Sequence, residues 1–521
     1  MSGSTTLGFR QIYGIKSGIS DNISFVDNHT VTYVAGHTIV QYNKVDKRQR
    51  FIHTSEISDA ITAFTSGVGK KLCAVGERGD RPQAHLFDLR TSRRKKTLVA
   101  QDVQAKEFVS MKLSEDNQLL LTLTGAPDYT LMCWNWAKAK LVASLQVSHS
   151  NPVSRCSFSP IDASIACVTG KDCVKFFRIA ERDMRPLQET QLDGNNFTAH
   201  CWLRAPEDHC VAGSEEGQLV LFKSSEYVCH LDCPLGVEFP VVSMMSYEAG
   251  FVVGSAKGTV FFVQVDPSKA IDGDDRPGMF SIVKKISTNL TSGSIFSLCL
   301  NQDEETMALV SSDSQMLQLP TSNVNALTDD DFSMMQVSFH GPKKITGLDV
   351  CVRKPLFATT AKDNTLRIWN FQTNKLELTK HFPEDMFCVA MHPSGLHVAV
   401  GFTDKLRIYH VLVDDLRSCL ELGIKSCREC HFSPGGNVLA AVNGNNINIY
   451  DFHTGEKLID LRGHNNKVRN VYWLKNGFQL VSCGQDGAVY LWNLEGKRLG
   501  DYVNKGIIQI LKRLMKTLSM T

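Results

Sequence analysis

Residues 462–493, RGHNNKVRNVYWLKNGFQLVSCGQDGAVYLWN, carry the pattern that decides the fold of this chain of 521 residues. A Gly-His pair opens the stretch, a polar turn follows its middle strand, and a hydrophobic run ends at Trp492. Upstream, Tyr450, Tyr409 and Trp369 close segments of the same plan, at successive spacings of 42, 41 and 40 residues. A regular spacing near forty residues predicts one four-stranded antiparallel sheet in each repeat.

The position that closes each repeat can be followed upstream of Trp369 through seven further repeats. These positions are Tyr42, Phe87, Trp134, Phe177, Phe222, Val263 and Leu319. We therefore expect an all-β protein made of two tandem WD40 β-propellers. The first is predicted to be seven-bladed and to occupy residues 1–325. The second is predicted to be incomplete, with about four blades in residues 340–503, and an acidic, turn-rich stretch predicts a junction at residues 326–339.

Residues 504–521 differ in character from the repeats. Ile507, Leu511, Leu514 and Leu518 recur at helical spacing, and basic residues stand among them. We expect a short amphipathic C-terminal helix that packs against the open end of the second array. A disordered tail or a segment bound to a membrane surface are the alternatives.

Two repeats carry a set of four polar and aromatic residues that is typical of WD40 repeats. The sets are His340, Thr359, Asp363 and Trp369, and His464, Ser482, Asp486 and Trp492. We expect each set to form a buried network in which the Asp accepts from the His ring and the hydroxyl orients that ring. A serine-hydrolase triad of His464, Ser482 and Asp486 is the competing interpretation. Duplication of the set in two repeats argues against it.

Composition excludes several functional classes. The formal net charge is +2, and this balance argues against a nucleic-acid-binding protein. No run of eighteen apolar residues occurs, so we predict no membrane span. The sixteen cysteines lack a regular spacing and the N-terminus lacks the apolar core of a signal peptide, which together favour the cytoplasm.

One segment matches a cofactor motif. Cys427-Arg428-Glu429-Cys430-His431 has the spacing of a covalent haem attachment site. We expect Cys427 and Cys430 to lie in one strand with their side chains on opposite faces, where they cannot chelate together. We therefore predict no cofactor, no metal site and no enzymatic activity.

A basic cluster stands out from the near-neutral background. It consists of Arg90, Arg93, Arg94, Lys95 and Lys96. Such a cluster is either a solvated rim of a blade or a contact for an acidic partner surface.

Several stretches extend beyond a generic WD40 repeat. They include Lys47-Arg48-Gln49-Arg50-Phe51-Ile52, Ile345-Thr346-Gly347-Leu348, His392-Pro393-Ser394-Gly395, Val413-Asp414-Asp415-Leu416-Arg417-Ser418 and Asp486-Gly487-Ala488-Val489-Tyr490. As an ordered set over about residues 8–503, they resemble the cilia- and flagella-associated WD-repeat family of axonemes. Members of this family normally have two seven-bladed propellers and a long coiled coil, and this chain departs from that plan after the fourth blade of the second array.

The resemblance implies a non-enzymatic scaffold in the axoneme of a cilium or flagellum. Its expected partners are the doublet microtubule and its tubulin, with inner-arm dynein or a neighbouring regulatory complex. Its expected role is to support assembly or regulation of the inner dynein arms, and so motility. A general WD40 adaptor in a soluble trafficking, assembly or ubiquitination complex is the alternative function.

Overall fold

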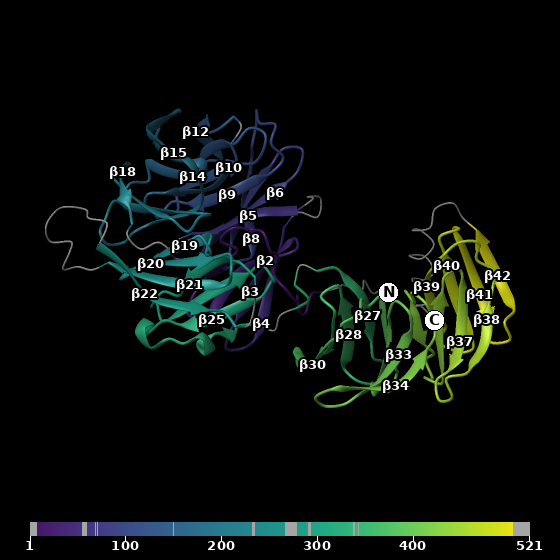
Figure 1. Cartoon of the computed structure of the whole chain (residues 1–521). Helices are drawn as coiled ribbons and strands as arrows, with labels where there is room; N and C mark the ends of the chain where they lie inside the picture. Colours follow the sequence, from purple (N-terminus) through teal and green to yellow (C-terminus); the bar gives the residue numbers. More distant parts are fainter. Residues whose placement is uncertain are drawn as a thin grey trace. The chain divides into compact units, whose positions relative to one another are not determined.

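The computed structural model describes residues 8–54, 60–67, 69, 71–149, 151–231, 235–265, 279–289, 293–336, 339–341 and 343–503. It divides into two compact units, Met1–Pro342 and Lys343–Thr521, called unit 1 and unit 2 below (Figure 1). In the described ranges no helix is both long and apolar enough to cross a membrane. The helix predicted at residues 504–521 lies outside the described residues.

Five sheets of unit 1 each have four antiparallel strands that follow one another in sequence order. The first contains β1 (Ile23–Phe25), β2 (Thr30–Ala35), β3 (Thr38–Asn43) and β4 (Arg48–His53). The second contains β5 (Ala60–Ser66), β6 (Leu72–Arg78), β7 (Gln83–Asp88) and β8 (Arg93–Val99). The third contains β9 (Phe108–Leu113), β10 (Leu119–Thr124), β11 (Thr130–Asn135) and β12 (Lys140–Gln146).

The last two four-stranded sheets of unit 1 come later in the chain. One contains β19 (Val241–Tyr247), β20 (Gly250–Ser255), β21 (Thr259–Val265) and β22 (Phe280–Ser287). The other contains β23 (Ile295–Leu300), β24 (Thr306–Ser311), β25 (Met316–Pro320) and β26 (Ser333–Met334). Between β25 and β26 lie two short 3-10 helices, η2 (Val324–Ala326) and η3 (Asp329–Asp331). Strand β26, which pairs with β25, thus falls inside the stretch predicted as a junction, residues 326–339.

A six-stranded sheet accounts for the middle of unit 1. Its strands are β13 (Val153–Phe158), β14 (Ile165–Ala180), β15 (Asp183–Trp202), β16 (His209–Ser214), β17 (Leu219–Lys223) and β18 (Glu226–His230). The first part of β14 pairs with β13 and its second part with β15, and β15 is divided in the same way between β14 and β16. Asp172 has a φ of 59°, and Ile179 N donates to Ser164 O at 2.7 Å, so β14 folds back on itself. The sheet therefore has the strand content of two repeats.

The first and last sheets of unit 1 are neighbours. Ile23 N in β1 donates to Ser297 Oγ in β23 at 3.3 Å. Tyr33 of β2 donates to Gln336 Oε1, just after β26, at 2.7 Å. Buried apolar residues of β2 and β24, including Val31 and Val310, share one hydrophobic cluster. The chain of unit 1 therefore returns to its starting sheet.

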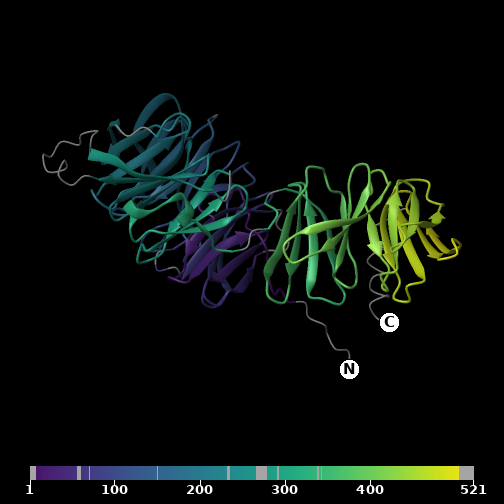
Figure 2. The same cartoon turned by 60° about the horizontal axis from the view of Figure 1, so that its bottom comes forward.

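Unit 2 contains four more sheets of four antiparallel strands, which follow one another along the chain in Figures 1 and 2. The first has β27 (Ile345–Val350), β28 (Leu356–Ala361), β29 (Thr365–Asn370) and β30 (Lys375–His381). The second has β31 (Cys388–Met391), β32 (His397–Gly401), β33 (Leu406–Val411) and β34 (Leu416–Leu422). The third has β35 (Cys430–Phe432), β36 (Val438–Asn443), β37 (Asn446–Asp451) and β38 (Lys457–Leu461). The fourth has β39 (Val468–Trp473), β40 (Gln479–Gly484), β41 (Ala488–Asn493) and β42 (Arg498–Val503).

The strand sequences explain these sheets. Middle strands such as β20 and β36 consist mostly of small and apolar residues and are buried on both faces, because sheets pack on either side of them. Outer strands such as β8 and β42 carry charged residues towards solvent. The prediction of an all-β protein built from repeated four-stranded antiparallel sheets is confirmed.

Candidate functional site

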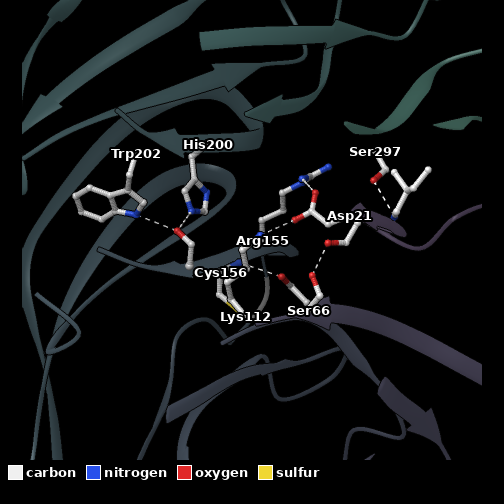
Figure 3. A network of polar contacts seen from close by, with 12 residues as sticks. Asp21, Ser66, Lys112, Arg155, Cys156, His200, Trp202 and Ser297 are labelled. Carbon is white, nitrogen blue, oxygen red and sulfur yellow. Dashed lines mark hydrogen bonds and ion pairs between the residues drawn. The ribbon is translucent and has the colours of Figure 1, made fainter. Parts of the chain in front are cut away.

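A cavity of about 410 Å³ lies inside unit 1. Seven strand segments contribute to its lining, namely β1, β5, β9, β13, the end of β15, β19 and β23. Each is the first strand of a four-stranded repeat, when β15 is counted by the part that pairs with β16. These first strands therefore surround one common space, and polar side chains from several of them meet there (Figure 3).

Arg155 is the centre of this polar network. Its Nη1 lies 2.9 Å from Asp21 Oδ1, and its Nη2 donates to Val242 O at 2.9 Å and to Phe296 O at 3.4 Å. Lys112 Nζ lies 3.3 Å from the second carboxylate oxygen of Asp21. The planar guanidinium group thus connects β13 with the segment before β1, with β19 and with β23, which a single-point donor such as lysine cannot do.

The charges in this network compensate one another. Burial acts to raise the pKa of Asp21, but the nearby charges of Lys112 and Arg155 outweigh burial, and the pKa is well below its usual value. Asp21 is therefore ionised at neutral pH and balances part of the positive charge. Because Arg155 is largely buried while Asp21 and Lys112 are partly exposed, the group holds the strands together rather than presenting a free charge.

A second group in the cavity centres on His200 of β15. Its Nε2 lies 2.6 Å from Ser157 Oγ and its Nδ1 lies 3.0 Å from Thr169 Oγ1. Trp202 Nε1 also donates to Ser157 Oγ at 3.0 Å. Burial lowers the pKa of His200 to about 3, and the charges of Arg155 and Lys112 act in the same direction. At neutral pH this imidazole is a weak base, which makes the Ser157–His200 pair a poor nucleophile and base.

Sequence reasoning missed both groups. Arg155 stands in a strand, and His200 in the last six residues of a strand (197–202), that otherwise hold small, apolar or uncharged residues. A charged or titratable residue in such a strand was the signal that could have indicated a buried polar network, because buried polar groups need hydrogen-bond partners. Their partners were not visible, since Asp21 and Thr169 come from distant parts of the sequence.

In the last repeat, the four predicted network residues lie together. Trp492 Nε1 donates to Ser482 Oγ at 2.8 Å, and Ser482 Oγ lies 2.8 Å from His464 Nε2. His464 Nδ1 lies 3.2 Å from both carboxylate oxygens of Asp486. The backbone N–H of Asn465 also donates to Asp486, at 2.8 Å. Burial lowers the pKa of His464, although the hydrogen bond and charge of Asp486 act to raise it.

Hydrogen bonds locate part of the predicted set of His340, Thr359, Asp363 and Trp369. Trp369 Nε1 donates to Thr359 Oγ1 at 3.0 Å. Asp363 accepts from Thr365 N at 3.0 Å, and His340 is completely buried. The same indole-to-hydroxyl bond occurs in unit 1 between Trp134 and Thr122, also at 3.0 Å. The bond therefore recurs beyond the two predicted sets.

The predicted basic cluster lies at an outer edge of unit 1. Arg93, Arg94, Lys95 and Lys96 occupy β8, the outermost strand of its sheet, and Arg90 stands in the turn before it. All five side chains are exposed. Lys95 forms an ion pair of 3.1 Å with Asp88, and hydrogen bonds from Thr91 N and Lys95 lower the pKa of Asp88 to about 2. The cluster thus combines one internal ion pair with an excess of positive charge.

The expectation for the haem-like motif is wrong in one respect. Strand β35 begins only at Cys430, and the residues before it turn, so that Cys427 and Cys430 do not alternate across a strand. Both are buried beside Cys388, whose sulfur lies 3.4 Å from that of Cys430. Across the described part of the chain, no group of three or more His, Cys, Asp or Glu side chains is arranged to hold a metal ion.

These features define a WD-repeat protein with a β-propeller-like fold. The model of the family "WD domain, G-beta repeat" matches residues 334–370 and 455–493, which contain all eight members of the two predicted networks. The chain is 31% identical to cilia- and flagella-associated protein 57 of Mus musculus, over 95% of this chain and 43% of the mouse protein. It is 28% identical to cilia- and flagella-associated protein 57 A of Tetrahymena thermophila, over 93% of this chain and 42% of that protein.

The predicted resemblance to the cilia- and flagella-associated WD-repeat proteins is therefore confirmed. A more distant relative, at 21% identity over 91% of this chain, is the 77 kDa echinoderm microtubule-associated protein of Lytechinus variegatus. The chain spans less than half the length of the cilia- and flagella-associated relatives.

Proposed function

We propose that this protein is a non-enzymatic scaffold of the ciliary or flagellar axoneme. It binds doublet microtubules there and supports the assembly or regulation of inner dynein arms. The observation that carries the proposal is the similarity to cilia- and flagella-associated protein 57 over nearly the whole of this chain. The similarity to a microtubule-associated protein of an echinoderm favours a location on the microtubule over membership of a soluble trafficking or ubiquitination complex.

The architecture suits a scaffold. We infer that unit 1 is a closed seven-bladed propeller, because seven first strands line one cavity and β1 contacts β23. Unit 2 is a second array of four blades. Closure and the Arg155 network make the loops of unit 1 a preformed surface, so binding a partner requires little ordering of the protein.

The exposed basic cluster on β8 is our proposed contact with the microtubule. The surface of tubulin is acidic, and Arg and Lys on an exposed strand edge attract such a surface over about 8–10 Å at physiological salt. A contact of this kind raises the association rate and weakens as salt is added. Charged residues also protect an edge strand from unwanted pairing, which is the competing explanation of the cluster.

Extraction of axonemes tests the proposal. Cells that express the tagged full chain are treated with detergent, and the membrane-free axonemes are washed in rising salt. We expect the protein to stay with the axonemes after detergent and to leave them only in salt. Complete release with the soluble fraction at the first wash, beside a retained axonemal marker, would instead establish a soluble adaptor.

The inner-arm role needs a separate measurement. Axonemes from cells that lack the protein should contain less inner-arm dynein heavy chain by quantitative mass spectrometry, while outer-arm heavy chains stay constant. Unchanged inner-arm content would remove this part of the proposal and leave the axonemal location untouched.

A further inference from the structure

Three buried cysteines of unit 2 meet between its second and third sheets. Cys388 is the first residue of β31 in the second sheet, and Cys430 is the first residue of β35 in the third sheet. The sulfur atoms of Cys388 and Cys430 lie 3.4 Å apart. Cys427 lies in the turn before β35, and its carbonyl oxygen accepts a hydrogen bond from the Cys388 thiol at 3.3 Å. All three side chains are buried, so thiols from two different sheets share one enclosed space.

The pairing of the strands explains why Cys388 and Cys430 face each other. Cys388 pairs with Gly401 in the second sheet, and Cys430 pairs with Ala441 in the third. Both cysteines belong to one hydrophobic cluster, which joins these two sheets. Val389, the residue after Cys388, belongs instead to the cluster between the first and second sheets. Because successive residues of a strand point to opposite faces, Cys388 points towards the third sheet and Cys430 towards the second.

The packing keeps the two sulfur atoms in direct contact. A side chain at Gly401 would overlap the Cys388 sulfur and the carbonyl oxygen of Cys427, so the glycine leaves room for both. A disulfide bond requires a sulfur–sulfur distance of about 2.0 Å. The sulfur atoms of Cys388 and Cys430 are therefore about 1.4 Å further apart than a covalent bond would place them.

We propose that Cys388 and Cys430 are a site of reversible oxidation, at which a peroxide converts the two thiols into a disulfide bond between the second and third sheets of unit 2. The oxidant is a small peroxide, because the thiols are buried and a larger reagent has no access to them. The product ties two neighbouring sheets together by a covalent bond that a thiol reductant can break.

Cys427 gives the oxidant its first point of attack. The residues on either side of it, Ser426 and Arg428, are exposed, so this thiol lies just below the surface. Hydrogen bonds from the thiols of Cys388 and Cys430 hold the pKa of the Cys427 thiol well below its usual value. The thiolate, rather than the thiol, is the nucleophile towards peroxides and disulfides. Cys427 therefore reacts before its two neighbours.

The reaction proceeds in three balanced steps. The Cys427 thiolate attacks hydrogen peroxide, whose O–O bond breaks, and a sulfenic acid and a hydroxide ion form. The Cys430 thiol condenses with this sulfenic acid, which gives a disulfide between Cys427 and Cys430 and releases water. The sulfur of Cys388, which loses its proton to the hydroxide ion, then attacks Cys430, and Cys427 leaves as a thiolate. A low pKa makes Cys427 a good leaving group. In total, Cys388 and Cys430 lose two electrons and two protons, and one peroxide is reduced to two water molecules.

Peptide mapping of the folded full chain tests the site. The parent and all variants carry Cys419→Ser, because Cys419 is exposed and would couple copies of the chain. After treatment with hydrogen peroxide and alkylation of the remaining thiols, mass spectrometry should find the peptide of Cys388 linked to that of Cys430. Dithiothreitol should reverse the link. Free thiols or sulfinic acids at both positions in the oxidised, folded chain would overturn the proposal.

Thermal melting measures the effect of the link on unit 2. The disulfide closes a loop of about 40 residues, which restricts the unfolded chain. We expect oxidation to raise the melting temperature of unit 2 by about 5–10 °C. Cys388→Ser should abolish both the link and this rise. A rise of the same size in the oxidised Cys388→Ser variant would contradict a disulfide at this site.

Two further substitutions test the route of the reaction. Cys427→Ser should slow formation of the link by about ten-fold or more, because it removes the thiolate that attacks the peroxide. Cys483→Ser is the matched control, since Cys483 is a buried cysteine of β40 in the fourth sheet, and it should keep the parental rate. Circular dichroism establishes that each variant is folded. A parental rate in the Cys427→Ser variant would overturn the role of Cys427 as the point of attack.

Discussion

The indole of Trp492, the Ser482 hydroxyl, the His464 ring and the Asp486 carboxylate form one continuous chain of hydrogen bonds. It ends at two backbone N–H groups that donate to Asp486, those of Asn465 and of Ala488, the first residue of β41. Loss of one member leaves the next buried polar group without a partner, which costs more than the bond itself contributes.

Removal of the carboxylate should therefore destabilise unit 2. We expect Asp486→Ala to lower the free energy of unfolding of unit 2 by about 2–4 kcal/mol, because buried His464 and two backbone donors lose their acceptor. Denaturant unfolding monitored by tryptophan fluorescence measures the change. Asp404→Ala is the matched control, because Asp404 is an exposed aspartate in the corresponding turn of the second sheet, and its change should stay within about 0.5 kcal/mol. Equal stability of both variants would contradict the expectation.

The neutral ring of His200 gives unit 1 a pH-dependent stability. Its pKa is lowered to about 3 in the folded protein, so the unfolded chain binds one more proton between pH 3 and 6.5. The contribution of His200 to the free energy of unfolding is fully present above pH 6.5. It is lost as pH falls towards 3, at about 1.4 kcal/mol per pH unit. Urea unfolding of the parent chain between pH 4 and 6 should include this contribution in its slope, together with those of the other groups that titrate in the same range.

The slope can be assigned by substitution. His200→Gln should reduce the rise of unfolding free energy with pH by about one proton equivalent, whatever its effect on absolute stability. His37→Gln changes an exposed histidine of the same unit and should leave the slope as it is. A slope that survives His200→Gln would mean that the ring does not titrate in this range.

At the scale of strands and sheets, Arg155 joins elements that are distant in the sequence. It sits on β13, and its guanidinium holds Asp21 and the carbonyls of Val242 and Phe296. Sheets of unit 1 are thus connected across the cavity as well as through their neighbours. Because a ring of sheets has no single continuous core, such a cross-connection limits relative movement of its blades.

Substitution of Arg155 should loosen unit 1. We expect Arg155→Ala to lower the free energy of unfolding by about 2–4 kcal/mol, since two carbonyl groups lose their guanidinium donor and Asp21 keeps only Lys112 as a charged partner. Arg155→Lys should cost less, because lysine can still pair with Asp21 but has no planar fork for the carbonyls. Arg185→Ala is the control, because Arg185 is exposed and its ion pair with Asp183 contributes about 0–1 kcal/mol. Thermal melting and limited proteolysis of unit 1 rank the three variants by stability. Equal stability of Arg155→Ala and Arg185→Ala would contradict the role of Arg155 in connecting the sheets.

Repeat spacing predicted the sheets well because each repeat carries its own turn and strand-closing residue, as at Tyr42, Phe87 and Trp134. It did not predict the six-stranded sheet, because continuation of β15 from one repeat into the next depends on backbone pairing rather than on residue type. It found the set around His464 because that set lies within one repeat. It missed the set around Arg155, whose partners belong to four different repeats.

At the scale of the whole molecule, the most strongly charged edge of the described residues is strand β8 of unit 1, which is basic and fits an acidic surface. Its four basic side chains are exposed, so their charge can be reversed without disturbing the buried core of unit 1.

Charge reversal on β8 separates a microtubule contact from a solvated edge. Replacement of Arg93, Arg94, Lys95 and Lys96 by Glu should release the protein from membrane-free axonemes at lower salt than the parent chain, because the attraction to an acidic surface becomes repulsion. The control carries the same change in net charge on dispersed exposed lysines, at Lys138, Lys257, Lys375 and Lys475. It should be released at nearly the parental salt concentration, since a contact depends on local charge more than on net charge. Equal release of both variants would show that β8 only protects its own edge, and the axonemal contact would then have to lie elsewhere on the protein.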